Sequence, residues 1–254
     1  MSKIIATANQ KGGVGKTTTA VNLAACVADL GRRVLLVDMD PQGNATSGLG
    51  MSAKGGNELY SVMTGLCKAS EAVRVTRFKH LSLLPSSVDL SGCEVELVGE
   101  AQRESVLKNA LGEIRDEYDY IFIDSPPSLG LLTLNALTAA DSVLVPIQCE
   151  YYALEGVGQL INTLQLVKKR LNPPLEVEGV VLTMLDGRTN LGLQVVSEVK
   201  RYFKGKVFST VVPRNVRLSE APSHGLPIHI YDPNCTGADA YRKLAGEFIK
   251  RNEG

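Results

Sequence analysis

Residues 10–18 read Gln-Lys-Gly-Gly-Val-Gly-Lys-Thr-Thr, and this glycine-rich stretch decides the fold. It stands between the apolar run Ile4-Ile5-Ala6 and a run of helical pattern from Thr18 to Leu30. Glycines at a strand-to-helix turn let successive backbone N–H groups point at one anion, and the helix N-terminus adds a positive dipole end. The stretch therefore predicts a phosphate-binding loop between a strand and a helix.

Side chains of the same stretch add charge and a metal ligand. Lys16 supplies a full positive charge, and Thr17 supplies a hydroxyl suited to Mg²⁺. The strict P-loop pattern requires glycine where this chain has Gln10, so the match is to a variant that carries a second lysine, Lys11. A lone exposed lysine is usually a solvated charge. Its place at the opening of the loop argues against that interpretation for Lys11.

Two later segments place carboxylates at the ends of apolar runs. The segment from Arg33 to Asn44 contains Asp38 and Asp40, and strand alternation points both side chains toward the same side. The segment Tyr120-Ile-Phe-Ile-Asp124 ends in a carboxylate that is suited to hold Mg²⁺ through its water shell. One such run would be weak evidence, because buried strands often end in a turn-forming aspartate. The three segments in this order predict a nucleotide site.

The string at residues 11–18 resembles the deviant Walker A loop of the MinD/ParA ATPases. The resemblance implies an ATP-binding loop formed by Lys11, Gly12, Gly13, Val14, Gly15, Lys16, Thr17 and Thr18. It implies that Lys11 reaches the nucleotide of a second subunit, that Lys16 holds the β- and γ-phosphates, and that Asp40 positions the attacking water. Asp38 then supports the metal shell or the loop, while Thr17 and Asp124 hold Mg²⁺.

Two outer segments, residues 182–192 and 211–227, resemble the chromosome-partitioning ATPases of the ParA/Soj type, and this resemblance covers essentially the whole chain. It implies non-specific binding of double-stranded DNA through Arg188, Arg214 and Arg217, and packing of Met184 and Pro213 near the adenine. It also implies a ParB/Spo0J-type centromere-binding partner that stimulates hydrolysis. Without the resemblance, we would interpret an isolated arginine as a solvated charge, and Met184 and Pro213 as core residues.

Length and composition fit one α/β domain over residues 1–254, with 44% hydrophobic residues. The 27 basic residues balance 27 acidic ones, so nucleic-acid binding requires a local patch. The five cysteines show no CxxC spacing, which predicts reduced thiols in a cytoplasmic protein and argues against zinc or iron–sulfur relatives. No apolar run approaches the ~18 residues that a membrane span requires.

Short apolar runs alternate with stretches of helical period. The runs that predict strands are residues 4–8, 34–38, 81–84, 120–124, 142–146, 179–185 and 207–212. Helices are predicted for residues 18–30, which precede Gly31, and for residues 155–170, which precede two prolines. Buried strands separated by helices predict a mostly parallel, twisted sheet with helices on both faces. The fold class is therefore a single-domain P-loop NTPase.

Two alternatives share this nucleotide site. A division regulator of the MinD type would use a C-terminal amphipathic helix on membranes, and Tyr241, Leu244, Phe248 and Ile249 do form an apolar stripe. A stripe that narrow is more typical of a helix packed on the core, so no C-terminal anchor is expected, and no helix-turn-helix precedes the loop. A switch that depends on nucleotide occupancy alone is the second alternative. The favoured hypothesis is an ATP-sandwiched homodimer that binds DNA on the nucleoid and is released by hydrolysis.

Overall fold

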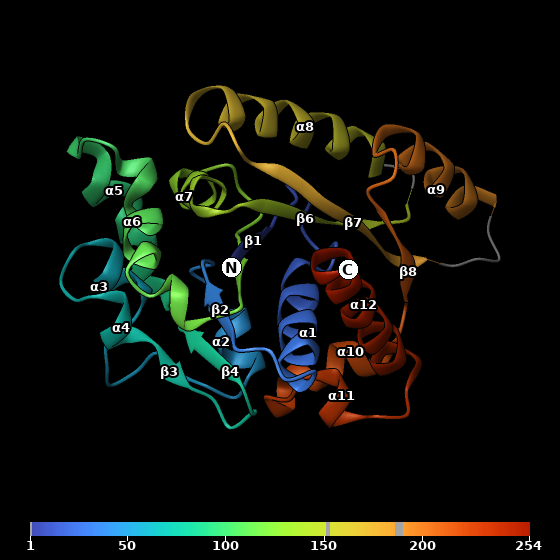
Figure 1. The fold of residues 1–254 in the computed structure, drawn as a ribbon, viewed down its shortest axis with the longest axis horizontal. Coiled ribbons are helices and arrows are strands. Elements are labelled where there is room, and N and C mark those ends of the chain that lie inside the picture. Colours follow the sequence, from blue (N-terminus) through green and yellow to red (C-terminus); the bar gives the residue numbers. More distant parts are fainter. Residues whose placement is uncertain (1, 151–152, 186–189) are drawn as a thin grey trace.

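The computed structural model describes residues 2–150, 153–185 and 190–254. Within these residues the core is one eight-stranded sheet, in the order β3-β4-β2-β5-β1-β6-β7-β8 (Figure 1). The strands are β1 (Lys3–Thr7), β2 (Val34–Asp38), β3 (Arg74–Val75), β4 (Leu81–Leu84), β5 (Tyr120–Asp124), β6 (Ser142–Gln148), β7 (Glu176–Leu185) and β8 (Val207–Pro213). All neighbouring pairs are parallel except β3 with β4. The predicted fold class is confirmed.

All seven predicted strands are present, and the sequence missed only β3 among the strands described. This edge strand has two residues, and Val75 is 84% exposed. A strand of two residues has no alternation to detect, so it leaves no pattern in the sequence. It pairs antiparallel with β4 and forms one edge of a sheet that is otherwise parallel.

Alternate residues of the inner strands enter two separate apolar clusters. In β1, Ile4 and Ala6 belong to one cluster and Ile5 to the other, and β2 divides Leu35 from Leu36 in the same way. This follows from the period of two in a strand, which points successive side chains to opposite faces. Both faces are therefore covered, which explains why the strands read as continuous apolar runs.

The helices fall on the two faces accordingly (Figure 1). One cluster packs under α3 (Leu59–Met63), α6 (Val106–Gly112), α7 (Leu131–Ala139), α8 (Ala153–Arg170) and α9 (Asn190–Tyr202), with the short α4 (Ala69–Ala72) and α5 (Cys93–Glu96) at the rim. The other packs under α1 (Lys16–Asp29) and α12 (Thr236–Glu253), with α2 (Asn44–Gly48), α10 (Val216–Glu220) and α11 (Ile228–Tyr231). Helix α1 begins two residues earlier than predicted, because Gly15 adopts a left-handed conformation at its N-cap.

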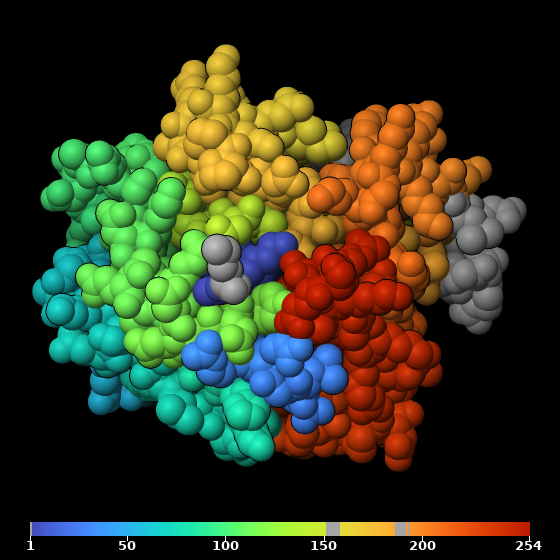
Figure 2. Space-filling model, viewed as in Figure 1, coloured from blue at the N-terminus to red at the C-terminus, as the bar shows by residue number. Residues whose placement is uncertain are grey.

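Helix α12 packs its apolar stripe on the sheet. Tyr241, Leu244 and Phe248 are each at most 1% exposed, and the Phe248 ring lies 5.1 Å from the ring of Tyr120. At the end of the helix, Glu253 bonds to Arg32 in the turn after α1, where the two segments meet at the surface (Figure 2). The apolar stripe therefore packs on the core, as its narrow width predicted.

Within residues 2–150, 153–185 and 190–254, none of the helices combines the length and the apolar character that a membrane crossing demands.

Replacing Phe248 by alanine should lower the free energy of unfolding by about 3–5 kcal/mol, because it leaves a cavity against the rings of Tyr120 and Phe122. Urea denaturation of the nucleotide-free protein measures the loss. Tyr202→Ala serves as the control, because Tyr202 is 57% exposed and its removal should cost less than about 1 kcal/mol. Similar losses for both variants would show that α12 is not held by this contact.

Candidate functional site

A cavity of about 510 Å³ lies at the carboxyl ends of the central strands. Strand β1 leads into the glycine loop, and its neighbours β5 and β6 end beside it. In doubly wound sheets ligands bind at this edge of the sheet. The cavity is lined by Gly12, Gly13, Gly15, Lys16, Thr17, Thr18, Asp40, Gln42, Asn44, Pro127 and Met184. The sequence did not single out Gln42, Asn44 or Pro127, which carry no motif of their own.

The loop that opens α1 has the backbone of a phosphate cradle. Gly13 and Gly15 have φ angles of 74° and 86°, in the left-handed region that residues with a Cβ avoid. Lys16 is only 7% exposed, and its Nζ donates to the carbonyl oxygen of Lys11 at 3.2 Å. Burial lowers the pKa of Lys16, while the charges of Asp124 and Asp40 oppose that shift. The ammonium is thus poorly hydrated, which strengthens its attraction for an anion.

Contacts with neighbouring strands fix the loop in this shape. Asn9 donates its Nδ2 to the carbonyl of Pro146 at 2.7 Å and accepts from the amide of Lys11 at 3.1 Å. The Thr183 hydroxyl donates to the carbonyl of Val14 at 2.9 Å. Contacts to β6 and β7 therefore hold the start and the middle of the loop. Sequence reasoning missed Asn9 and Thr183, because their partners lie far along the chain.

Asp124 ends β5 with a carboxylate that is buried and incompletely paired. Its pKa is raised well above the usual value by burial and then by the charge of Asp38, while Thr17 and Lys16 act in the opposite direction. The Thr17 hydroxyl faces this carboxylate, but neither Oδ atom completes a hydrogen bond with a described residue. A buried carboxylate beside a hydroxyl fits a divalent cation with oxygen ligands. Thr17 and Asp124 thus suit Mg²⁺.

The two aspartates that follow β2 have different surroundings. Asp38 accepts from the amide and the hydroxyl of Thr46, both at 2.7 Å, and burial raises its pKa to about 6. Asp40 accepts from the amide of Gln42 at 3.0 Å and lines the cavity. Of the two roles suggested for Asp38, these contacts favour support of the loop.

Lys11 pairs with a carboxylate outside the loop. Its Nζ lies 3.6 Å from Oε2 of Glu150, and Nη2 of Arg214 lies 3.5 Å from Oε1 of the same glutamate. The family resemblance implied that Lys11 contacts a partner's nucleotide and that Arg214 contacts DNA. Glu150, which brings them together, follows the end of β6 and has no motif that marks it.

The remaining candidate residues are dispersed. Met184 lines the nucleotide cavity and has a φ of 52°, whereas Pro213 lines a separate cavity of about 480 Å³ between β8 and α12. Arg188 lies outside the described residues. Arg217 on α10 is half exposed, and it bonds to Glu220 at 2.8 Å and lies 3.4 Å from Asp232. A DNA phosphate would compete with these two carboxylates for its guanidinium.

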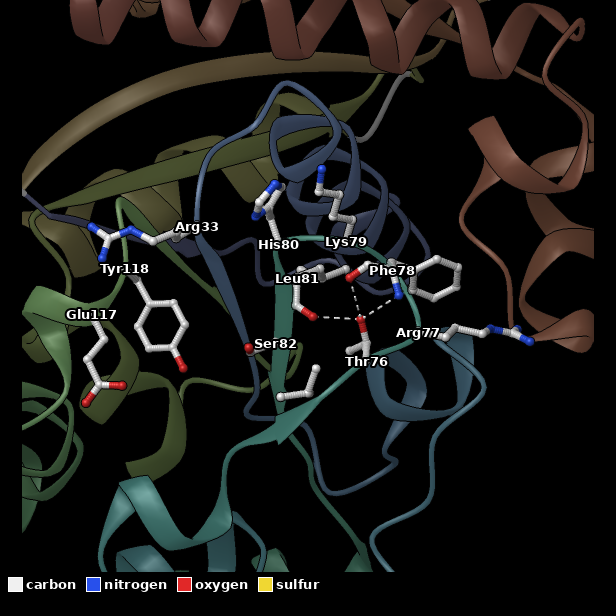
Figure 3. Close-up of a pocket in the computed structure, with 11 residues that line it drawn as sticks. Arg33, Thr76, Arg77, Phe78, Lys79, His80, Leu81, Ser82, Glu117 and Tyr118 are labelled. Atoms are coloured by element: carbon white, nitrogen blue, oxygen red, sulfur yellow. Dashed lines mark hydrogen bonds between the residues drawn. The ribbon is translucent and has the colours of Figure 1, made fainter.

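Another cavity, of about 370 Å³, lies at the opposite edge of the sheet (Figure 3). Its wall includes the turn before β4, which Thr76 stabilises by donating to the carbonyl of Leu81 at 2.7 Å. Arg33 lines this cavity too, and it pairs with Asp119 at 2.8 Å. The glycine loop and the three aspartates lie at the other ends of the strands. The nucleotide site is therefore assigned to the cavity at the carboxyl edge.

Comparison with known proteins identifies the family of the chain. Residues 2–177 match the family described as AAA domain. The chain is 59% identical to the sporulation initiation inhibitor protein Soj of Bacillus subtilis, over 97% of this chain and 98% of that protein. It is 52% identical to the chromosome-partitioning ATPase Soj of Treponema pallidum, over 99% of each chain.

A solved structure with a bound nucleotide analogue shares the fold. Cobyrinic acid a,c-diamide synthase from Mycobacterium smegmatis, solved with an ATP analogue and magnesium, superposes with a TM-score of 0.87 and 38% identity. The match covers all of this chain and 97% of that one. The glycine loop, the strand-end carboxylates and the full-length relatives agree, and the chain belongs to the ParA/Soj family of chromosome-partitioning ATPases.

Proposed function

We propose that this chain hydrolyses ATP to ADP and phosphate with Mg²⁺, and that ATP binding drives a homodimer that grips DNA during chromosome segregation. The observation that carries the nucleotide part is the juxtaposition of Lys16, which is buried in the glycine loop, with the incompletely paired Asp124. A triphosphate with a divalent cation satisfies both groups at once. The ATP analogue and magnesium bound by the Mycobacterium smegmatis protein support this choice of ligands.

In the proposed complex the loop from Lys11 to Thr18 surrounds the phosphates, with Lys16 on the β- and γ-phosphates. Thr17 and Asp124 hold the Mg²⁺, which when bound neutralises charge on the phosphate oxygens. Met184 lines the cavity and suits the adenine end, whereas the position of Pro213 in a different cavity gives that residue no support. Asp38 keeps the following loop in place through Thr46.

Asp40 is proposed to orient the water that attacks the γ-phosphate. Its Oδ1 accepts from the Gln42 amide, which directs the carboxylate along the wall of the cavity. A carboxylate in this place accepts a hydrogen bond from water and lines it up with the phosphorus, as positioning residues do in other phosphoryl-transfer sites. This role separates a hydrolase from a switch that depends on occupancy alone.

Lys11 is proposed to contact the triphosphate of a second copy, which creates the sandwich dimer. Dimerisation would then bring arginines from both copies onto one surface, so that DNA binding depends on ATP. Arg217, and Arg188 outside the described residues, are the proposed phosphate contacts. A ParB/Spo0J-type partner would stimulate hydrolysis and release the DNA. The proposed site of action is the nucleoid in the cytoplasm.

Asp40→Ala and Asp40→Asn should each slow phosphate release on the order of 10²-fold, because both remove the carboxylate that orients water. The asparagine variant keeps an oxygen for the Gln42 amide, so it separates catalysis from loop structure. Steady-state phosphate release and ATP affinity are measured together. Asp116→Ala, at an exposed position, is the control. Unchanged turnover in both Asp40 variants would leave the occupancy switch as the better account.

Lys11→Ala should retain ATP as a monomer, whereas Lys16→Ala should lose both ATP binding and the dimer. The carbonyl that accepts from Lys16 is the backbone oxygen of residue 11, so the Lys11 variant keeps the loop contact. Sedimentation velocity with ATP and Mg²⁺ reports the dimer, and Lys54→Ala controls for loss of an exposed charge. A Lys11→Ala protein that still dimerises with ATP would refute the contact between copies.

Arg217→Ala should preserve the ATP-dependent dimer but weaken DNA binding roughly tenfold at moderate salt, and flatten the salt dependence, because phosphate contacts release counterions. Electrophoretic retardation with ATP across a salt series gives both quantities. Arg33→Ala removes the same charge from an arginine paired with Asp119 at the far edge of the sheet. If the two variants bind DNA alike, the contact surface lies elsewhere.

A further inference from the structure

Lys11 has an ionic partner within its own chain. Its Nζ lies 3.6 Å from Oε2 of Glu150, with the two side chains 32% and 48% exposed. If Lys11 is to reach a nucleotide on a second copy, this pair must first separate. The strength of the pair therefore enters the equilibrium of any dimer that uses Lys11.

Glu150 is held in place by the end of β6. The amide of Glu150 donates to the carbonyl of Gln148 at 2.9 Å, and the Gln148 side chain donates to Oε1 of Glu150. Between them, Cys149 donates its amide to Thr183 at 3.1 Å, which ties this segment to β7. The carboxylate is thus presented to Lys11 from a fixed backbone, which lowers the entropic cost of the pair.

A second cation shares the same carboxylate. Nη2 of Arg214, directly after β8, lies 3.5 Å from Oε1 of Glu150, so the two oxygens face two different cations. When Lys11 leaves, Glu150 keeps a counter-ion and Arg214 is relieved of a neighbouring positive charge. Both effects make the departure of Lys11 less costly than breaking an isolated pair.

We propose that Glu150 is the counter-ion that Lys11 exchanges for the phosphates of a second copy, and that Arg214 stabilises Glu150 after the exchange. This inference rests on the proposed function, because it takes the ATP-dependent dimer as its end state. Glu150 opposes dimerisation, because it holds Lys11 within its own chain until the triphosphate of the second copy displaces the Glu150 carboxylate. Arg214 acts as a positioning residue in this exchange, in place of the DNA contact that the sequence suggested.

The two partners of the exchange have opposite effects on dimerisation. Glu150→Gln removes the attraction that holds Lys11, so it should favour the dimer. Arg214→Gln removes the repulsion that helps Lys11 to leave, so it should disfavour the dimer. In the double variant Glu150→Gln/Arg214→Gln, the added arginine substitution should no longer change the dimer dissociation constant. Glu150 is the group that brings Arg214 and Lys11 together, so the repulsion between them depends on it.

The test is sedimentation velocity over a range of protein concentrations, with Mg²⁺, a saturating non-hydrolysable ATP analogue, low salt and no DNA. Each exposed pair changes an equilibrium about twofold to threefold, and each dimer exchanges two pairs. Glu150→Gln should therefore lower the dimer dissociation constant about threefold to tenfold, and Arg214→Gln should raise it about twofold or more. Glu176→Gln is the matched control, because Glu176 pairs with Lys206 at 3.7 Å at the other end of β7.

A dissociation constant for Glu150→Gln that equals the control, or exceeds it, overturns the proposal. An Arg214→Gln effect of the same sign as Glu150→Gln also overturns it. If the wild-type chain stays monomeric with the analogue, the proposed function fails and the exchange fails with it. The pair itself has an independent readout: without nucleotide, Glu150→Gln should speed acylation of Lys11 by an activated ester about twofold or more, measured by mass spectrometry. Equal acylation rates in Glu150→Gln and Glu176→Gln would show that the pair does not form.

Discussion

The attraction between a poorly hydrated lysine and the carboxylates around it organises this protein. Lys16 is buried at the start of α1, and Asp124 and Asp40 face it from the ends of one strand and the loop after another. A parallel sheet makes this arrangement, because the strand order places β5 between β1 and β2 and aligns Asp38 with Asp124. Charges that water would separate are therefore brought together by burial of the strands that carry them.

The sequence was informative where local pattern and chemistry coincide. The run from Tyr120 to Asp124 is apolar, of strand length and terminated by a carboxylate, so the pattern predicted a buried strand there, and the structure has β5 over the same residues. The glycines of the loop were equally clear in the sequence. At Gly13 and Gly15 the backbone is left-handed, a conformation that residues with a Cβ seldom adopt. Such features depend on neighbours along the chain, which a sequence displays directly.

Contacts between distant segments could not be found in this way. Asn9 and Thr183 fix the loop through partners on β6 and within the loop itself, yet each is an ordinary polar residue in its own segment. Glu150 likewise looks like a loop glutamate until β6 and β8 place it between Lys11 and Arg214. Pro213 shows another limit, because a sequence does not say which cavity a residue at this edge of the sheet lines, and in the structure Pro213 lines the cavity between β8 and α12.

The anchoring of the glycine loop has a consequence for how binding energy is used. Hydrogen bonds from Asn9 and Thr183 fix the shape of the loop before any ligand binds. Binding therefore does not have to order a disordered segment. The entropic cost of ordering a disordered loop is not subtracted from the free energy of ligand binding. A preordered loop of this kind also loses little conformational entropy when a ligand binds, so it needs fewer contacts to reach a given affinity.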